Sequence, residues 1–114
     1  MEENTGLITQ MRKGAIEYCV LALLVGRERY GYELVQALSS VDGMLVTEGT
    51  VYPILSRLKR EGLVTAHWRE SREGPPRKYY QITTAGQAAL EAFKSQWRLF
   101  ASAVDTFLGG GDNP

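Results

Sequence analysis

The sequence predicts a mainly α-helical chain that carries one small β-hairpin and ends in a long helix. Three observations predict this class. Apolar residues recur at helical spacing in several segments, two short β-rich stretches flank a Gly-Pro loop, and residues 84–108 run without proline. We expect residues 1–83 to form one domain, residues 84–108 a dimerisation helix, and residues 109–114 a disordered tail.

Composition limits the class of protein. The chain has 114 residues, 44% of them hydrophobic, which suits one domain with a modest core. Its formal net charge is zero, but residues 57–78 hold seven basic and three acidic residues, so a local +4 is balanced by −4 elsewhere. A single cysteine, a polar acidic start and no apolar run near the roughly 20 residues of a membrane span favour a cytoplasmic protein.

The first predicted helix covers residues 7–25, where apolar side chains recur at helical spacing. Gly14 would weaken its middle by up to about 1 kcal/mol relative to alanine, which suggests a close packing partner there. Cys19 lies on the apolar face. We interpret it as a buried, inert thiol rather than a redox sensor, because no His or Lys neighbour in sequence would lower its pKa.

A second helix is predicted after the polar connection at residues 26–29. Tyr30 or Gly31 opens it, and its inner face carries Leu34, Val35 and Leu38. Asp42 and Gly43 end it, and residues 44–46 form a short apolar run that fits a strand stub. With the helix that follows, this order fits a helix-turn-helix arrangement with a longer turn than the minimal one.

Residues 47–60 are the segment around which the chain is organised. Thr47 suits the N-cap position and Gly62 the left-handed position after the helix end, while Pro53 falls early, where its missing N–H does least harm. One face is apolar, with Val51, Ile54, Leu55 and Leu58. The other faces carry hydroxyls, a tyrosine and cations: Thr50, Tyr52, Ser56, Arg57, Lys59 and Arg60. Such a helix can pack on a domain and still read a nucleic acid, although a solvated surface helix has the same pattern.

Two strands are predicted after this helix, over residues 63–69 and 77–83, joined by a Gly-Pro-rich loop at residues 70–76 that carries Arg72. A hairpin directly after a basic helix is typical of a wing. Its cations Arg72, Arg77 and Lys78 could contact phosphates or only keep an exposed hairpin soluble. His67 has no second metal-type ligand beside it, so packing is favoured over metal binding or catalysis.

The last predicted helix, capped by Thr83, is longer than a small core needs. Large apolar residues alternate by four and three along it, which is the spacing of a coiled-coil-like seam. Part of this stripe can cover the chain's own domain. The outer part would leave a sticky patch, so we expect a homodimer with an interface at Trp97, Phe100, Val104 and Phe107.

Two motifs give the chain a family resemblance. The block Gly49-Thr50-Val51-Tyr52-Pro53 and the block Arg77-Lys78-Tyr79-Tyr80 resemble the PadR family of bacterial transcriptional regulators, over nearly the whole chain. The single C-terminal helix resembles the short members, which include a lactococcal multidrug regulator. The resemblance implies a winged helix-turn-helix, a dimer through the last helix, and repression relieved by a small molecule. It implies a flat aromatic ligand at Trp97, for which we expect Phe93 and Met11 as further walls.

The sequence therefore predicts a dimeric repressor on an inverted-repeat DNA operator. Base edges would meet Thr50, Tyr52, Ser56 and Arg57, and phosphates would meet Lys59, Arg60, Arg72, Arg77 and Lys78. A protein-interaction module that binds no DNA is the alternative, and the local +4 argues against it. No constellation for catalysis or for a cofactor is present in the sequence, so an enzyme is the least favoured class.

Overall fold

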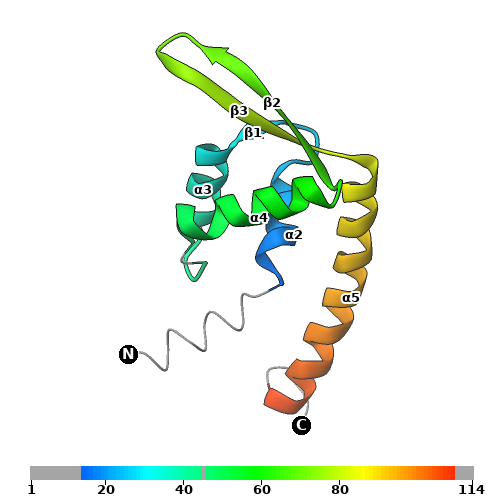
Figure 1. Cartoon of the computed structure of the whole chain (residues 1–114). Coiled ribbons are helices and arrows are strands. Elements are labelled where there is room, and N and C mark those ends of the chain that lie inside the picture. Colours follow the sequence, from blue (N-terminus) through cyan, green and yellow to red (C-terminus); the bar gives the residue numbers. More distant parts are fainter. Residues whose placement is uncertain (1–13, 45, 110–114) are drawn as a thin grey trace.

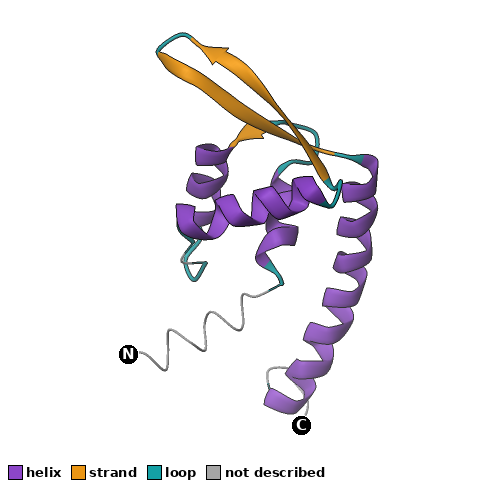
Figure 2. Ribbon diagram, in the orientation of Figure 1, coloured by secondary structure: helices purple, strands orange, loops and turns teal. Residues whose placement is uncertain are grey.

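The computed structural model describes residues 14–44 and 46–109, which form a cluster of helices with a small antiparallel sheet on one side (Figure 1). The sheet has the strand order β1-β3-β2, and β2 and β3 extend beyond it as a long hairpin (Figure 2). The elements in chain order are α2 (Ile16–Leu23), β1 (Arg29–Tyr30), α3 (Gly31–Ser39), α4 (Glu48–Arg60), β2 (Val64–Ser71), β3 (Gly74–Ile82) and α5 (Thr84–Leu108). The predicted class, mainly α with a hairpin and a long last helix, is confirmed.

The core lies where α2, α3, α4 and the base of the hairpin meet. Each of these elements supplies side chains that are at most 1% exposed, and each such leucine contributes about 1.5–3 kcal/mol through burial. Leu90, on the first half of α5, completes the core from the side. The apolar face predicted for α4 is confirmed, since it supplies the fully buried Val51, Leu55 and Leu58.

The bounds of α4 follow from signals on either side of it. Gly62 adopts a left-handed backbone with φ of 79° just after the helix, and the N–H groups of Gly62 and Leu63 donate to the carbonyls of Lys59 and Leu58. This pairing satisfies the last free carbonyls, as predicted for a glycine there. Thr47 does occupy the N-cap position, but its hydroxyl makes no capping hydrogen bond, so that part of the prediction is wrong.

The first helix was predicted over residues 7–25, and within the described part of that range the chain is helical only from Ile16 to Leu23. Residues 7–13 lie outside the described residues, and α2 begins at Ile16. Gly14 has φ of 85°, and no atom of the described residues lies within 4 Å of where a Cβ would stand. It therefore belongs to a turn before the helix and does not mark a close packing contact, which corrects the sequence interpretation.

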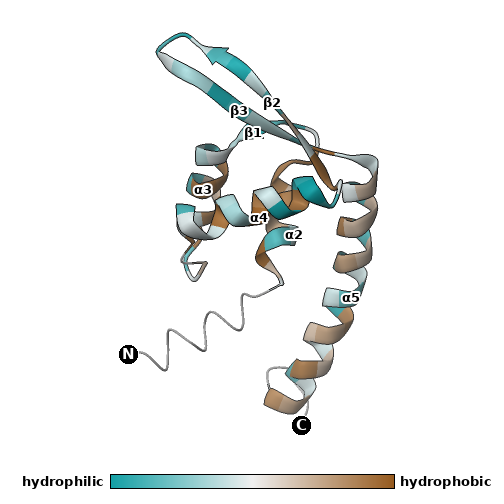
Figure 3. Cartoon of the chain, in the orientation of Figure 1, coloured by the Kyte–Doolittle hydropathy of each residue, from teal (hydrophilic) through white to brown (hydrophobic). Residues whose placement is uncertain are grey.

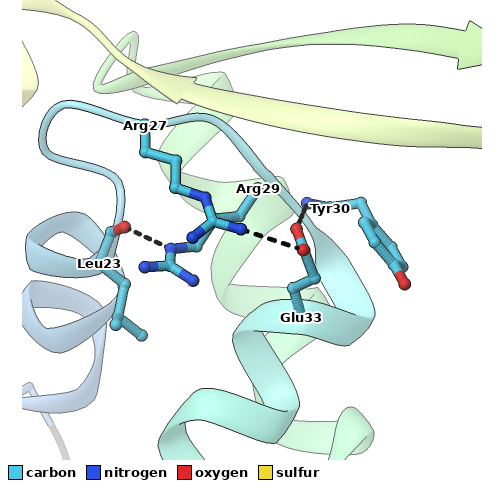
Figure 4. A network of polar contacts seen from close by, with 5 residues as sticks. All are labelled: Leu23, Arg27, Arg29, Tyr30 and Glu33. Atoms are coloured by element: carbon cyan, nitrogen blue, oxygen red, sulfur yellow. Dashed lines mark hydrogen bonds and ion pairs between the residues drawn. The ribbon is translucent and has the colours of Figure 1, made fainter.

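Strand β1 was not predicted. Arg29, expected in a polar connection, and Tyr30, expected near the start of the second helix, pair with Tyr80 and Tyr79 of β3. Tyr30 is also the N-cap of α3, as its predicted place at the helix start implies, and its backbone N–H donates to Glu33 Oε1 at 3.0 Å and so fixes the first turn (Figure 4). Arg27 pairs with the other oxygen of Glu33, and Arg29 donates to the carbonyl of Leu23, which ties the connection to the end of α2.

The segment between α3 and α4 contains no strand in its described part. Met44 and Val46 lie in irregular backbone, and Leu45 is outside the described residues. The apolar run is used for packing instead. Val46 is buried in the core, and its carbonyl accepts a hydrogen bond of 3.0 Å from the hydroxyl of Ser39, which holds the connection against α3.

The hairpin is longer than predicted and its turn is shorter. β2 reaches Ser71 and β3 begins at Gly74, so Pro75 and Pro76 lie in the strand and not in the loop. The register shifts by one between the pairs formed by Arg69 and Ser71, which leaves the two prolines opposite a single residue. Because β1 pairs only with Tyr79 and Tyr80, the edge of β3 away from β2 is unpaired beside the prolines in the described part of the chain, so a missing N–H on that edge costs no ladder bond.

Helix α5 has the predicted bounds, and its 25 residues give it a length of about 37 Å. Thr83 caps it by accepting from the N–H of Gly86 at 3.0 Å, and the Thr83 hydroxyl donates to the carbonyl of Gly62 at 2.8 Å. Its second half leaves the core and runs away from the domain (Figure 1). The radius of gyration is 16.3 Å, against about 13 Å for a compact chain of this length, because α5 and the hairpin both project.

Candidate nucleic-acid interface

The outward face of α4 is formed by small residues and one arginine. Gly49, Pro53, Ser56 and Arg60 are all exposed and follow one another at steps of four and three, opposite the buried face of the helix. The first three have small side chains, which leave the helix backbone open to close approach by another surface. Ser56 was predicted to contact bases and Arg60 to contact phosphates, whereas Gly49 and Pro53 were missed because neither carries a recognisable binding group.

Tyr52 lies on the flank of α4 that faces the hairpin. Its side chain is 40% exposed and stands directly against Gly31, the first residue of α3. Burial raises the pKa of the Tyr52 hydroxyl, and the nearby Glu48 carboxylate and Tyr30 hydroxyl raise it further. The phenol is therefore neutral at physiological pH and can donate a hydrogen bond.

Arg57 lies on the opposite flank, which faces α2. Its guanidinium forms an ion pair with Glu17 of α2, and the two side chains are 38% and 13% exposed. Thr50, two helical turns away on the same flank, is half-buried. Of the residues predicted for base contacts, these two therefore lie to the side of the outward face.

The cations of the hairpin are held by aromatic rings. The guanidinium carbon of Arg77 lies 4.4 Å from the ring centre of Tyr30, and Lys78 Nζ lies 5.8 Å from the Trp68 ring. Arg72 is exposed at the turn of the hairpin. Cation–π contacts keep these charges in defined positions on the wing while leaving them able to bind an anion.

A notch of about 400 Å³ separates the hairpin from α4 and the start of α3. Three predicted residues line this notch: Tyr52 of α4 and Arg77 and Lys78 of the wing. The rings of Tyr30, Trp68 and Tyr80 line it too, and these were not predicted. Trp68, on the strand that faces the notch, is 67% exposed. The lining residues are Tyr30, Gly31, Tyr52, Trp68, Arg77, Lys78 and Tyr80.

A cluster at the base of the wing was also missed. Arg69 Nη2 pairs with Glu28 Oε2 at 2.7 Å, and the guanidinium of Arg69 covers Tyr79 at 4.3 Å. His67 Nε2 lies 3.0 Å from Glu28 Oε1, yet this buried oxygen accepts no hydrogen bond of good geometry within the described part of the chain. Arg69 is therefore the firmer partner, and the cluster holds the wing to the connection before β1. No pattern in the sequence indicates this cluster, because Glu28 is distant along the chain from the other residues.

The second half of α5 exposes large apolar side chains, and much of its ribbon has the brown of hydrophobic residues in Figure 3. Trp97 is 47% exposed, Phe100 63% and Phe107 88%, while Val104 is half-buried. Phe93 stacks between Tyr18 of α2, at 4.1 Å between ring centres, and Trp97, at 5.7 Å. The structure thus brings Phe93 and Trp97 together, and Met11, the third predicted wall, lies outside the described residues.

The described residues carry little that would suit other chemistry. No group of three or more potential metal ligands occurs within residues 14–44 and 46–109. Burial raises the pKa of the Cys19 thiol, so the thiol is not activated as a nucleophile. Among the helices that the structure describes, none is both long enough and apolar enough to cross a bilayer.

The fold and the interface define a winged helix-turn-helix protein, in which α3 and α4 form the helix-turn-helix and the hairpin forms the wing. Comparison with known proteins gives the family. The family model described as the transcriptional regulator PadR-like family matches residues 20–92, and the chain belongs to this family. Its members are regulators that bind DNA and are not enzymes, so the predicted family and non-enzymatic class are confirmed.

Solved structures and a relative in sequence agree with this assignment. A PadR family transcriptional regulator from Eggerthella lenta has a TM-score of 0.82 and 30% identity, over 94% of this chain and 93% of that one. A PadR-like transcriptional regulator from Bacillus cereus has a TM-score of 0.78 and 40% identity, over 90% of this chain and 99% of that one. A transcriptional regulator of Mycobacterium tuberculosis is 36% identical over 81 residues, which cover 71% of this chain and 74% of that protein.

Proposed function

We propose that the protein is a homodimeric repressor that acts in the cytoplasm on an inverted-repeat DNA operator. Each subunit lays the outward face of α4 in a major groove, and the wing follows the adjacent backbone. Ser56, Arg60 and Tyr52 lie nearest the bases, while Lys59, Arg72, Arg77 and Lys78 bind phosphates. Bound in this way, the dimer excludes other proteins from the same stretch of DNA.

The observation that carries this proposal is the pairing of a small-residue face with fixed cations beside it. Gly49, Pro53 and Ser56 are exposed and let α4 approach a groove closely. Arg77 and Lys78 stand across the notch from that helix, held by rings of the domain itself. Positive charge in defined positions next to an accessible helix is the arrangement that recognition of a DNA duplex requires.

The dimer interface in this proposal is the second half of α5. Trp97, Phe100 and Phe107 are exposed in the single chain, and large apolar side chains grouped along one helix favour association. A twofold dimer through α5 presents two α4 helices at a fixed separation, which matches an operator made of two inverted half-sites. Phe100, Val104 and Phe107 form the seam, with Trp97 at its inner end.

The ligand site in this proposal is formed by Trp97 and Phe93, with Met11 as a further wall. The rings of Trp97 and Phe93 lie 5.7 Å apart at an interplanar angle of 19°, so a flat aromatic guest would extend an existing stack. A guest at the seam changes the angle between the two α5 helices and hence the separation of the two α4 helices. It relieves repression to the extent that it binds the non-operator separation more tightly.

The test of this function is a selection of duplex fragments from random DNA with purified protein, followed by titrations at several salt concentrations. We expect an inverted repeat whose affinity falls by about 10³–10⁵ between 50 and 200 mM salt if six or more phosphates are contacted. A protein that recovers no common sequence and binds duplex DNA without a salt dependence would instead be a winged helix for protein contacts.

A further inference from the structure

Arg57, on the flank of α4 that faces α2, is held by a residue far away in sequence. Its Nη2 pairs with Glu17 Oε1, although 40 positions separate the two residues. The Glu17 side chain is 13% exposed, so its carboxylate depends on this partner, while Arg57 at 38% remains within reach of solvent. The pair therefore joins α2 to α4 at the flank of the candidate interface.

An arginine in this position has two alternative partners. A guanidinium binds carboxylates and phosphates with the same planar geometry, so a DNA strand that passes this flank of α4 competes directly with Glu17. Arg57 is exposed enough to turn towards such a strand, but the exchange leaves the Glu17 carboxylate without its partner, so the phosphate contact must compensate for the lost ion pair. Arg57 can therefore exist in two states, one held by Glu17 and one bound to DNA.

The residue next to Glu17 connects this ion pair to α5. The Tyr18 ring stacks on Phe93 at 4.1 Å with an interplanar angle of 3°. Burial raises the pKa of the Tyr18 hydroxyl, the Glu17 and Glu61 charges and a hydrogen bond to Glu17 raise it further, and Arg57 lowers it. Tyr18 thus touches the aromatic stack with its ring and lies close enough to the ion pair to feel both of its charges.

Phe93 in turn stacks on Trp97, whose side chain is 47% exposed. Direct contacts therefore run without a gap from the uncovered face of α5, through Phe93 and Tyr18, to Glu17 and Arg57. Rings in such a stack have few alternative positions, since a shift of one ring leaves its neighbour with a void or a clash.

We infer that Glu17 withholds Arg57 from DNA, and that the stack of Tyr18 and Phe93 couples this hold to whatever occupies the Trp97 face of α5. This inference rests on the proposed function and adds the regulation of its interface. Strengthening the stack fixes Tyr18 and Glu17 and keeps Arg57 on the α2 side. Disturbing it loosens Glu17 and frees Arg57 for the operator.

The first experiment is a double-mutant cycle on operator affinity, with a duplex selected by the wild-type protein. Glu17→Gln keeps the shape of the side chain and removes the charge that holds Arg57. We expect it to tighten binding about two- to fivefold, and to have no effect in an Arg57→Gln background. Arg57→Gln alone should weaken binding and lower the salt slope by about 0.9 if the guanidinium replaces one counterion.

The matched control is Glu61→Gln, which removes the same charge from an exposed residue at the end of α4 that has no ion pair with Arg57 in the described structure. A gain with Glu17→Gln that Glu61→Gln reproduces would reflect general repulsion and would overturn the inference. So would a gain that persists in the Arg57→Gln background, or an Arg57→Gln protein that melts lower but keeps wild-type affinity and salt slope.

The second experiment tests the connection to α5. Phe93→Leu removes the stack, and we expect it to tighten operator binding by about twofold in the wild-type background and not at all in the Glu17→Gln background. Sedimentation must give both proteins the same oligomeric state. If Phe93→Leu does not fold, Tyr18→Phe replaces it. This variant keeps the stack on Phe93 but loses the hydroxyl through which Tyr18 bonds to Glu17, so it breaks the coupling at the next step. Equal effects in both backgrounds would overturn the coupling.

Failure of the inference and failure of the proposed function can be told apart. A wild-type protein that binds no duplex in a salt-dependent manner removes the function and this regulation together. A wild-type protein that binds its operator, with strictly additive effects of Glu17→Gln and Arg57→Gln, removes the regulation alone.

Discussion

The ring of Tyr52 on α4 lies so close to Gly31 on α3 that no side chain fits between them. A Cβ on Gly31 would stand 2.4 Å from Tyr52 Cε1 and 2.8 Å from the hydroxyl oxygen. Both residues line the notch beneath the wing. This contact places the Tyr52 ring in the notch, on the flank of α4 beside its outward face.

Gly31→Ala should therefore impair DNA binding more than it impairs folding. Tyr52 is 40% exposed and can swing away, so we expect a destabilisation of only about 1 kcal/mol, at the low end for overpacking. The displaced ring then obstructs the notch and lowers operator affinity. Thermal unfolding and a DNA titration on the same protein measure the two effects. A Gly31→Ala, Tyr52→Leu double variant should regain stability, and if it does not, the clash is elsewhere.

Gly86→Ala should be a much more damaging substitution. A Cβ there would stand 2.2 Å from the carbonyl oxygen of Leu63 and 2.7 Å from Ile82 Cγ1, and a backbone oxygen cannot move aside as a ring can. We expect a loss of about 1–3 kcal/mol, or a melting temperature lower by about 5 °C or more. Gly74→Ala is the control, because nothing lies within 4 Å of its added Cβ and its change should stay within about 0.5 kcal/mol.

Local signals explain which elements could be predicted from the sequence. The bounds of α4 and α5 depend on neighbouring residues, such as the glycine at 62 and the hydroxyl of Thr83, and apolar spacing marks their inner faces. Strand β1 consists of two residues that pair with β3, and no local property of Arg29 or Tyr30 predicts a strand there. The pairing of Arg57 with Glu17 likewise joins residues 40 positions apart, so the sequence suggested Arg57 for DNA and could not indicate its intramolecular partner.

Lys78→Ala should weaken binding to all DNA sequences alike. Its Nζ lies 5.8 Å from the Trp68 ring and 6.0 Å from the Tyr80 ring, on the wing and away from the outward face of α4. Loss of one phosphate contact should reduce the slope of log affinity against log salt by about 0.9. Ser56→Ala, on the outward face of α4, is the contrast: its loss should depend on the operator sequence and leave the slope unchanged. If Lys78→Ala instead gave the sequence-dependent loss and Ser56→Ala the change in salt slope, the wing and not α4 would contact the bases.

Phe100→Asp with Val104→Asp should convert the protein to monomers. Two charges in an apolar seam would lack partners and oppose association by several kcal/mol. Sedimentation at micromolar concentration should give a dimer for the wild type and a monomer for the variant, whose tight operator binding should be lost as well. Ser102→Asp, at an exposed position between the two, is the control and should stay dimeric. A wild-type monomer under these conditions would contradict an interface on α5.

Trp97 should report a ligand at the seam. With Trp68 replaced by Phe, Trp97 is the sole indole, and a flat aromatic cation or a phenolic acid that stacks beside it should quench its fluorescence in a saturable way. The exposed position of Trp97 and its existing stack on Phe93 favour this geometry, since a planar guest then gains one more ring face. The same titration repeated with operator present should show a change in ligand affinity, because a ligand that alters DNA binding must be affected by DNA to the same degree. Calorimetry with Trp97→Ala provides the control without an indole: heat of binding should disappear there, and saturable binding that survives the substitution would place the pocket away from α5.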